Sequence, residues 1–196
     1  MPRLTVLVPL ANDAEKDLSA MVCTDIGSNM KQRIDDAVVW HERSRKSKPS
    51  VWCFGAGTDE AFRRGPTLST LAKKYLHTTH FFDNVIVNES RHNFYGTFEE
   101  IKWIVKSMEA NSLPADTQFV FFAPNWHLWR VRFIWFLFYQ WKWGKANFVA
   151  TNDGATFELW HECKAWVKVL LVWMRLVKSR DQISYPPVKH RYGIEN

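Results

Sequence analysis

One short stretch of this sequence brings together an amide, an imidazole and a guanidinium group, on Asn125, His127 and Arg130. The stretch follows a short apolar run at residues 119–122 and a break at Ala123-Pro124. His127 and Arg130 are three residues apart, so they share a face in the first turn of a helix. Free backbone N–H groups and the positive end of the helix dipole also favour an anion there. The stretch therefore predicts a strand, a turn and a helix whose first turn binds an anionic group.

Two of the nearby side chains have the chemistry of general acids or bases. His127 exchanges a proton near neutral pH, and Glu99 could orient His127 or hold a ribose hydroxyl. Arg33 and Arg130 could each hold a phosphate or carboxylate by two-point contacts. The structural alternative is that Arg130 pairs with Glu99 as a bridge and His127 is a satisfied neighbour. The sequence shows no nucleophile elbow, P-loop or metal cluster, so catalysis and ligand sensing without turnover both stay open.

The elements that must position these groups alternate between strands and helices. Apolar runs predict strands at residues 4–10, 51–54, 84–87, 119–122 and 147–151. Helical spacing predicts helices at residues 29–45, 65–77, 97–108, from 125 onward, and 156–178, whereas residues 14–27 read as a loop or a short helix. We expect a single Rossmann-like, doubly wound α/β domain over residues 1–180, with about five mostly parallel strands and helices on both faces. Residues 181–196 are expected to form a polar tail.

Polar residues or glycines follow every predicted strand. Because the carboxyl ends of parallel strands meet at one edge of a sheet, these clusters should lie together, where ligands bind in such folds. The candidate catalytic residues are His127 and Glu99. The candidate ligand-binding residues are Asn12, Asp13, Arg33, Gly55, Gly57, Ser90, Thr97, Asn125, Arg130 and Asn152.

Some of these candidates also have plain structural interpretations. Thr97, with Glu100 three residues later, matches a capping box at the start of a helix. Gly55 and Gly57 lack the third glycine of a dinucleotide fingerprint, because Glu60 stands there. These glycines form either a flexible turn or a loop that lets the backbone approach a ligand.

Two metal-like patterns do not support a metal site. His77, His80 and Asp83 should straddle a helix end and a loop, which makes a common coordination geometry improbable. His161-Glu162 is not followed by a second histidine at the spacing of zinc proteases. We therefore expect no metal.

Composition limits the class of protein. The 196 residues have a net charge of +6, which favours an anionic partner such as a small molecule. The basic run at residues 43–48 reads as cations at a helix C-terminus, so no nucleic-acid partner is expected. The three cysteines contain no CxxC pair, which fits a reducing compartment. The most apolar segment, residues 133–139, is far shorter than the ~20 residues of a membrane span. We therefore expect a cytoplasmic protein without a membrane span.

Tryptophan is unusually frequent, and five of the 11 Trp residues lie in the predicted helix 126–143. Residues 133–139 are apolar all round, which suits burial in the core. A homodimer face on helix 126–143 is the second interpretation, because aromatic side chains are favoured at interface cores. Interfacial membrane contact is the third, and the missing polar face of this helix argues against it.

The order of three motifs over residues 4–155 resembles the YdcF-like family, which includes the SanA and ElyC envelope proteins. The motifs are Arg33 on the first helix, Glu89-Ser90 leading to Thr97-Phe98-Glu99-Glu100, and His127-Leu128-Trp129-Arg130 after a strand. Glu100 replaces the family asparagine, and the spacing from Glu-Ser to Thr is longer here. The resemblance implies a Rossmann-like domain that binds a nucleotide-like small molecule. S-adenosylmethionine is reported for some relatives, and no reaction is firmly attached to the family.

Overall fold

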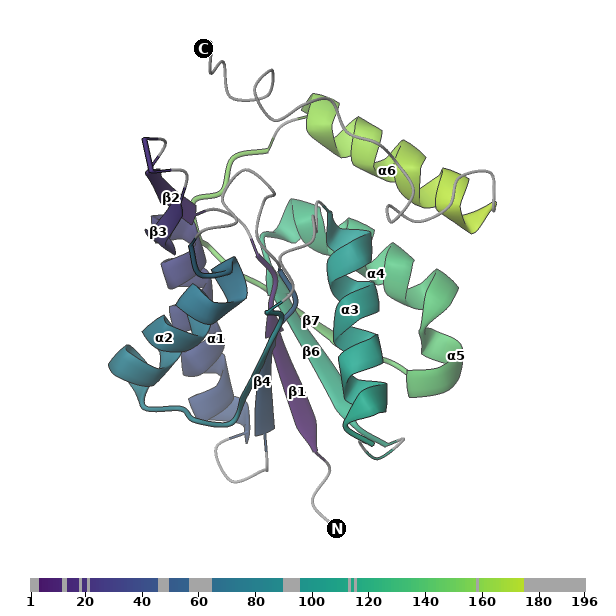
Figure 1. The fold of residues 1–196 in the computed structure, drawn as a ribbon. Helices are drawn as coiled ribbons and strands as arrows, with labels where there is room; N and C mark the ends of the chain where they lie inside the picture. Colours follow the sequence, from purple (N-terminus) through teal and green to yellow (C-terminus); the bar gives the residue numbers. More distant parts are fainter. Residues whose placement is uncertain are drawn as a thin grey trace.

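Five parallel strands form the centre of the computed structural model (Figure 1). They are β1 (Thr5–Pro9), β4 (Ser50–Phe54), β5 (Val85–Val87), β6 (Gln118–Ala123) and β7 (Asn147–Ala150). The structure describes residues 4–11, 14–17, 19–20, 22–45, 50–56, 65–89, 96–112, 114, 116–157 and 159–174.

The strand order is β5-β4-β1-β6-β7, with β1 in the middle. All five residues of β1 are buried, and Thr5 is in register with Ser50 of β4 on one side and Gln118 of β6 on the other. The chain therefore builds the sheet outward from β1 first in one direction and then in the other. This is the doubly wound, Rossmann-like α/β arrangement, and it confirms the predicted fold class.

Helices cover both faces of the sheet (Figure 1). Helices α1 (Ser28–Arg45) and α2 (Leu68–His80) lie on one face. Helices α3 (Thr97–Ala110), α4 (Asn125–Phe138) and the short α5 (Gln140–Trp143) lie on the other. Helix α6 (Leu159–Trp173) lies across the ends of α3 and α4. In the described part of the chain, no helix has the length and apolar character that crossing a bilayer requires.

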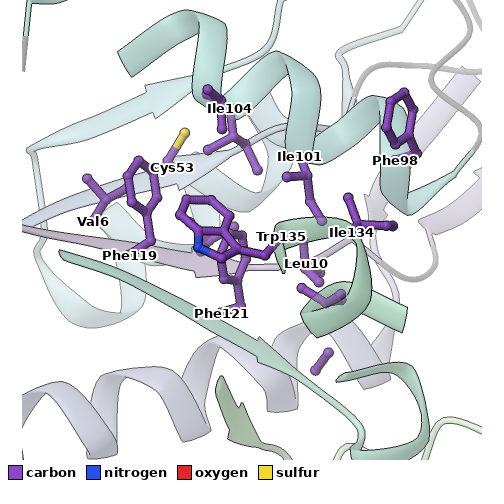
Figure 2. Close-up of a cluster of buried hydrophobic side chains, with 14 of the residues drawn as sticks. Val6, Leu10, Cys53, Phe98, Ile101, Ile104, Phe119, Phe121, Ile134 and Trp135 are labelled. Atoms are coloured by element: carbon purple, nitrogen blue, oxygen red, sulfur yellow. The ribbon is translucent and has the colours of Figure 1, made fainter. Parts of the chain in front are cut away.

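The alternation of side chains along β1 and β6 divides the core into two clusters. Val6 and Val8 pack toward α3 and α4, whereas Leu7 packs toward α1 and α2. Figure 2 shows the first cluster, in which the Trp135 ring of α4 lies 4.8 Å from the Phe119 ring and 5.2 Å from the Phe121 ring. This cluster fixes the position of α4, and hence of the residues in its first turn.

The main difference from the prediction is a two-stranded antiparallel hairpin, β2 (Ala14–Asp17) and β3 (Val22–Ile26). The expectation of a loop or short helix over residues 14–27 was wrong. The hairpin turn is held locally, because Asp17 Oδ1 accepts the backbone N–H groups of Ser19 and Ala20 at 2.9 and 3.1 Å. Its remaining stability comes from tertiary packing, since Cys23 and Ile26 are buried in the α1–α2 cluster.

The ends of two helices also differ from the prediction. Helix α2 begins at Leu68 rather than at Gly65, because the Thr67 side chain caps it by accepting the N–H of Thr70. Helix α6 begins at Leu159 rather than near Thr156. The predicted tail, residues 181–196, lies outside the described residues.

Candidate functional site

The candidate site lies at the carboxyl edge of the sheet, between the ends of β1 and β6. This is the point where the strand order reverses, and open α/β sheets bind ligands there. The fold brings five of the predicted site residues to this edge, all of them at most 8% exposed. They are Arg33 of α1, Thr97 and Glu99 of α3, and His127 and Arg130 of α4.

Thr97 joins the two predicted residues of the α4 turn. Its hydroxyl oxygen lies 2.7 Å from His127 Nε2 and accepts a hydrogen bond from Arg130 Nη2 at 2.9 Å. A guanidinium group only donates, whereas the Thr97 hydroxyl has one hydrogen and two acceptor lone pairs, so it can bond both groups with either tautomer of His127. The hydroxyl of Thr97 thus links the imidazole and the guanidinium and holds both in position.

His127 is held in its neutral form. Burial lowers the pKa of His127 well below its ordinary value, and the charges of Arg130 and Arg33 lower it further. At neutral pH the imidazole therefore acts as a hydrogen-bonding group rather than as a cation. An anion bound between the two arginines would oppose their charge and raise the pKa of His127.

Helix α6 supplies the ionic partners of this site. Arg130 Nη1 donates to Glu162 Oε1, and Lys168 Nζ donates to Glu99 Oε1. The structural alternative, a bridge between Arg130 and Glu99, was therefore wrong, because each of these residues pairs with α6 instead. Of the two roles considered for Glu99, it does not orient His127, since Thr97 makes the hydrogen bond to the ring. That Glu99 holds a ribose hydroxyl stays a prediction.

These ion pairs leave polar atoms without partners. Within the described residues, Arg130 Nε, Glu99 Oε2 and Glu162 Oε2 are buried and make no hydrogen bond. Buried polar atoms are nearly always satisfied, so each exception calls for an explanation. One unused donor and two unused acceptors in a single cluster are what a site for a polar ligand would present.

Arg33 has a structural role at the same edge. Its Nε donates to Asp153 Oδ2 at 2.5 Å, and its Nη1 donates to the carbonyl oxygen of Leu10 at 2.5 Å. Asp153 Oδ2 also accepts the Thr151 hydroxyl at 3.0 Å. Arg33 therefore ties α1 to the end of β1 and to the loop after β7. It also keeps a buried positive charge near His127.

Glu100 is a buried carboxyl group on the first turn of α3. Its Oε1 accepts the backbone N–H of Ala11 at 2.9 Å. Burial raises the pKa of Glu100 to about 7, although the bond from Ala11 and the charge of Arg33 oppose the shift. The predicted capping box was wrong, because Gly96 is the N-cap and the side chains of Thr97 and Glu100 bond elsewhere.

Gly55 allows α3 to approach the sheet closely. A Cβ at this position would lie 2.8 Å from Ile104 Cγ1 and 2.9 Å from the Glu100 carbonyl oxygen. Nearby, Ala11, Ser69 and Glu100 line a narrow gap between the ends of β1 and β4 and α2, which is too small to hold a water molecule. The close approach positions Glu100 beside β1.

The other predicted ligand-binding residues lie apart from the Thr97 cluster or outside the described residues. Asn125 and Asn152 are exposed, and the backbone N–H of Asn152 donates to Asp36 Oδ2 at 3.1 Å. Asn12, Asp13, Gly57 and Ser90 lie outside the residues that the structure describes.

The residues of the metal-like pattern bind separate carboxylates. His77 Nδ1 lies 2.6 Å from Asp83 Oδ1, whereas His80 Nε2 lies 2.7 Å from Asp35 Oδ1. Over the described ranges, no group of three or more His, Cys, Asp or Glu side chains could hold a metal ion.

Sequence reasoning missed the contribution of α6. The zinc-protease spacing gives Glu162 no role, and none of the sequence motifs includes Lys168. The signal was present in the helical spacing, because Glu162 stands seven residues before Val169, whose side chain is in the core. A charge on the buried side of an amphipathic helix needs a buried partner.

No protein-family model, curated protein or solved structure matches this chain. The class of protein is therefore defined by the fold and the polar cluster alone. It is a Rossmann-like α/β protein with a charged cluster at the switch point of the sheet, and three atoms of this cluster lack hydrogen-bond partners.

Proposed function

We propose that this protein binds a nucleotide-like small molecule through an anionic group, the phosphate of a phosphorylated compound or the carboxylate of S-adenosylmethionine, at the cluster formed by Thr97, Glu99, His127 and Arg130. The observation that carries the proposal is the unused Nε of buried Arg130, next to a neutral imidazole in the first turn of α4. A phosphate or carboxylate oxygen is the natural acceptor for such a donor.

The position of the cluster supports the same proposal. Helix α4 begins at the switch point between β1 and β6, so its free N–H groups and its dipole favour a negative charge there. The unused Glu99 Oε2 would accept a ribose hydroxyl. The resemblance to the YdcF-like family points to the same class of ligand, and the free cysteines fit a cytoplasmic location.

A ligand sensor without turnover is the second candidate function. The lowered pKa of His127 favours it, because it makes the imidazole a weak base and leaves the ring at pH 7 without the second proton that an imidazolium would donate as a general acid. Formation of a product from a bound ligand, with loss of that activity in His127→Ala, would exclude the sensor.

The test is a thermal-shift titration with inorganic phosphate, nucleotides and S-adenosylmethionine. A ligand at 100 times its dissociation constant adds about 2.7 kcal/mol to stability. For a domain of this size that corresponds to a rise of roughly 5–10 °C in the midpoint. We expect such a rise for the native chain and its loss in Arg130→Met.

Two further variants make the test specific. Arg132→Met removes a guanidinium from the same helix, one that stacks on Trp129 instead of entering the cluster, and should leave the shift unchanged. Glu162→Gln removes the carboxylate that occupies Arg130 and should strengthen binding. A shift that persists in Arg130→Met, or that disappears equally in Arg132→Met, would contradict the proposed site.

A further inference from the structure

The outward side of α6 is apolar. Six large hydrophobic side chains of this helix and its last turn are at least 38% exposed: Leu159, Trp160, Val167, Leu170, Trp173 and Met174. Successive members are one, three or seven residues apart, and with 3.6 residues per turn these spacings place all six on one side of the helix. The opposite side faces the protein, because it carries Glu162 and Val169. Single exposed hydrophobic residues are normal, but a continuous stripe along a helix marks a binding surface.

Helix α4 extends this stripe. Trp129, Phe133 and Phe136 are spaced by four and three residues, so they share a side of α4. Phe133, the middle residue, packs against Trp166 of α6 with ring centroids 5.1 Å apart. Trp129 and Phe136 are 61% and 58% exposed on either side of this contact. We call the exposed residues of α4 and α6 together the aromatic face.

Charge on the aromatic face is positive. The sequence has no Asp or Glu from residue 117 to residue 152, and only Glu162 from residue 159 to residue 174. Glu162 is 7% exposed and bonds inward to Arg130. Cations accompany the exposed tryptophans, since Lys164 Nζ lies 4.7 Å from the centre of the Trp160 ring and Arg132 Cζ lies 5.2 Å from that of Trp129.

We propose that the aromatic face binds the surface of an anionic lipid bilayer, with α6 lying in the plane of the interface. Tryptophan rings settle at the level of the lipid headgroups, and lysine or arginine heads beside them reach the anionic groups. Helix α6 suits this orientation, because its ion pairs to Arg130 and Glu99 hold its inner side against the protein.

Charge complementarity favours the bilayer over a second copy of the chain. A twofold dimer places the same patch on both sides of the interface. Lys164 and Arg132 would then face the cations of the partner copy, with no exposed carboxylate on α6 to balance them. An anionic bilayer presents the opposite charge and an apolar phase for the tryptophans.

The experiment is co-sedimentation of the full chain with vesicles of phosphatidylcholine alone and of phosphatidylcholine with phosphatidylserine. We expect binding to the phosphatidylserine vesicles, much weaker binding to phosphatidylcholine, and weakening with added salt. The double variant Trp160→Ser/Leu170→Ser should lose more than tenfold in partitioning. Lys164→Gln should lose roughly fivefold, the usual effect of one cation near an anionic surface.

Matched controls come from the other face of the sheet. Val39→Ser on α1 removes a hydrophobic side chain that is 43% exposed, and Lys73→Gln on α2 removes an exposed cation. Both should bind vesicles like the native chain. The melting midpoint of each variant should match that of the native chain, because all these substitutions are at the surface. A thermal melt checks this.

An independent readout uses Cys163, which lies within the apolar stripe and is exposed, whereas Cys23 and Cys53 are buried. A polarity-sensitive dye on Cys163 should shift its emission to the blue when phosphatidylserine vesicles are added. The proposal fails if the chain does not bind these vesicles, or if the double variant binds them as well as the native chain. A dimer that dissociates in the double variant, without vesicle binding, would assign the aromatic face to a second copy.

Discussion

Glu100 makes the stability of this protein depend on pH in a direction that can be worked out. Burial raises the pKa of its carboxyl group from the ordinary value of 4.5 to about 7 in the folded chain. The folded state therefore binds the Glu100 proton more tightly than the unfolded state does. The resulting stabilisation is complete below about pH 4.5 and is lost as the pH rises through about 7.

The perturbation we would make is Glu100→Gln. The glutamine keeps an oxygen that can accept the Ala11 N–H but cannot ionise. A difference of about 2.5 pKa units at about 1.36 kcal/mol per unit gives about 3 kcal/mol. Relative to the native chain, the variant should gain this amount between about pH 4.5 and about pH 8. Its melting midpoint should rise by roughly 6–12 °C relative to the native chain over the same range.

The assay is thermal or urea unfolding of both proteins across this pH range, with the difference plotted against pH. His127 has the opposite dependence, because its folded-state pKa is lowered and its contribution is lost as the pH falls below its ordinary value of 6.5. That contribution is present in both proteins and cancels in the difference. Glu89→Gln, at an exposed position after β5, is the control and should show no gain of this size. A flat difference for Glu100→Gln as well would refute the reasoning, because it would mean that the carboxyl group pays no penalty for burial.

Two further predictions concern the packing around the site. Arg33→Met should cost about 3–5 kcal/mol, because it leaves Asp153 buried without its cation, and Arg33→Met/Asp153→Leu should recover much of this loss. Urea unfolding of the three variants measures the recovery, and simple additivity of the two single losses would contradict the pairing. Gly55→Ala should cost about 1–3 kcal/mol, since its Cβ would lie 2.8 Å from Ile104 Cγ1. Thermal unfolding measures this cost, and Ile104→Ala, which removes Cγ1, should make the cost of adding Gly55→Ala smaller in the same chain. An unchanged midpoint in Gly55→Ala would contradict the close approach.

The fold could be predicted because its strands are simple in sequence. Residues 6–8 and 119–123 are continuous apolar runs, and they lie in the fully or almost fully buried strands β1 and β6. The alternation of such runs with amphipathic segments leaves few topologies other than a doubly wound sheet. The placement of His127 and Arg130 at the carboxyl edge follows from this topology alone.

The ionic and hydrogen-bonding partners of the candidate site residues could not be predicted in the same way. Glu162 lies 32 residues after Arg130, and Lys168 lies 69 residues after Glu99. No local rule connects residues so far apart, because their meeting depends on how α6 crosses α3 and α4. Thr97 was assigned to the cap on a local rule, whereas the nearby imidazole and guanidinium provided stronger partners for its hydroxyl. The hairpin at residues 14–26 was missed because tertiary burial of Cys23 and Ile26 outweighs its weak local pattern.

The carboxylate of Glu162 acts as a tethered competitor for any anion that seeks Arg130. A tethered group is present at an effective concentration on the order of millimolar, whatever the composition of the solution. The apparent affinity for an external anion equals the intrinsic affinity multiplied by the fraction of molecules in which Arg130 is free of Glu162. A ligand with a single carboxylate would only replace the contact that Glu162 already makes with Arg130, so the exchange would give no net stabilisation. A phosphate brings more charge and a third oxygen, with which it could also reach the unused Arg130 Nε. The pairing therefore favours a phosphorylated ligand over a monocarboxylate, including the carboxylate of S-adenosylmethionine.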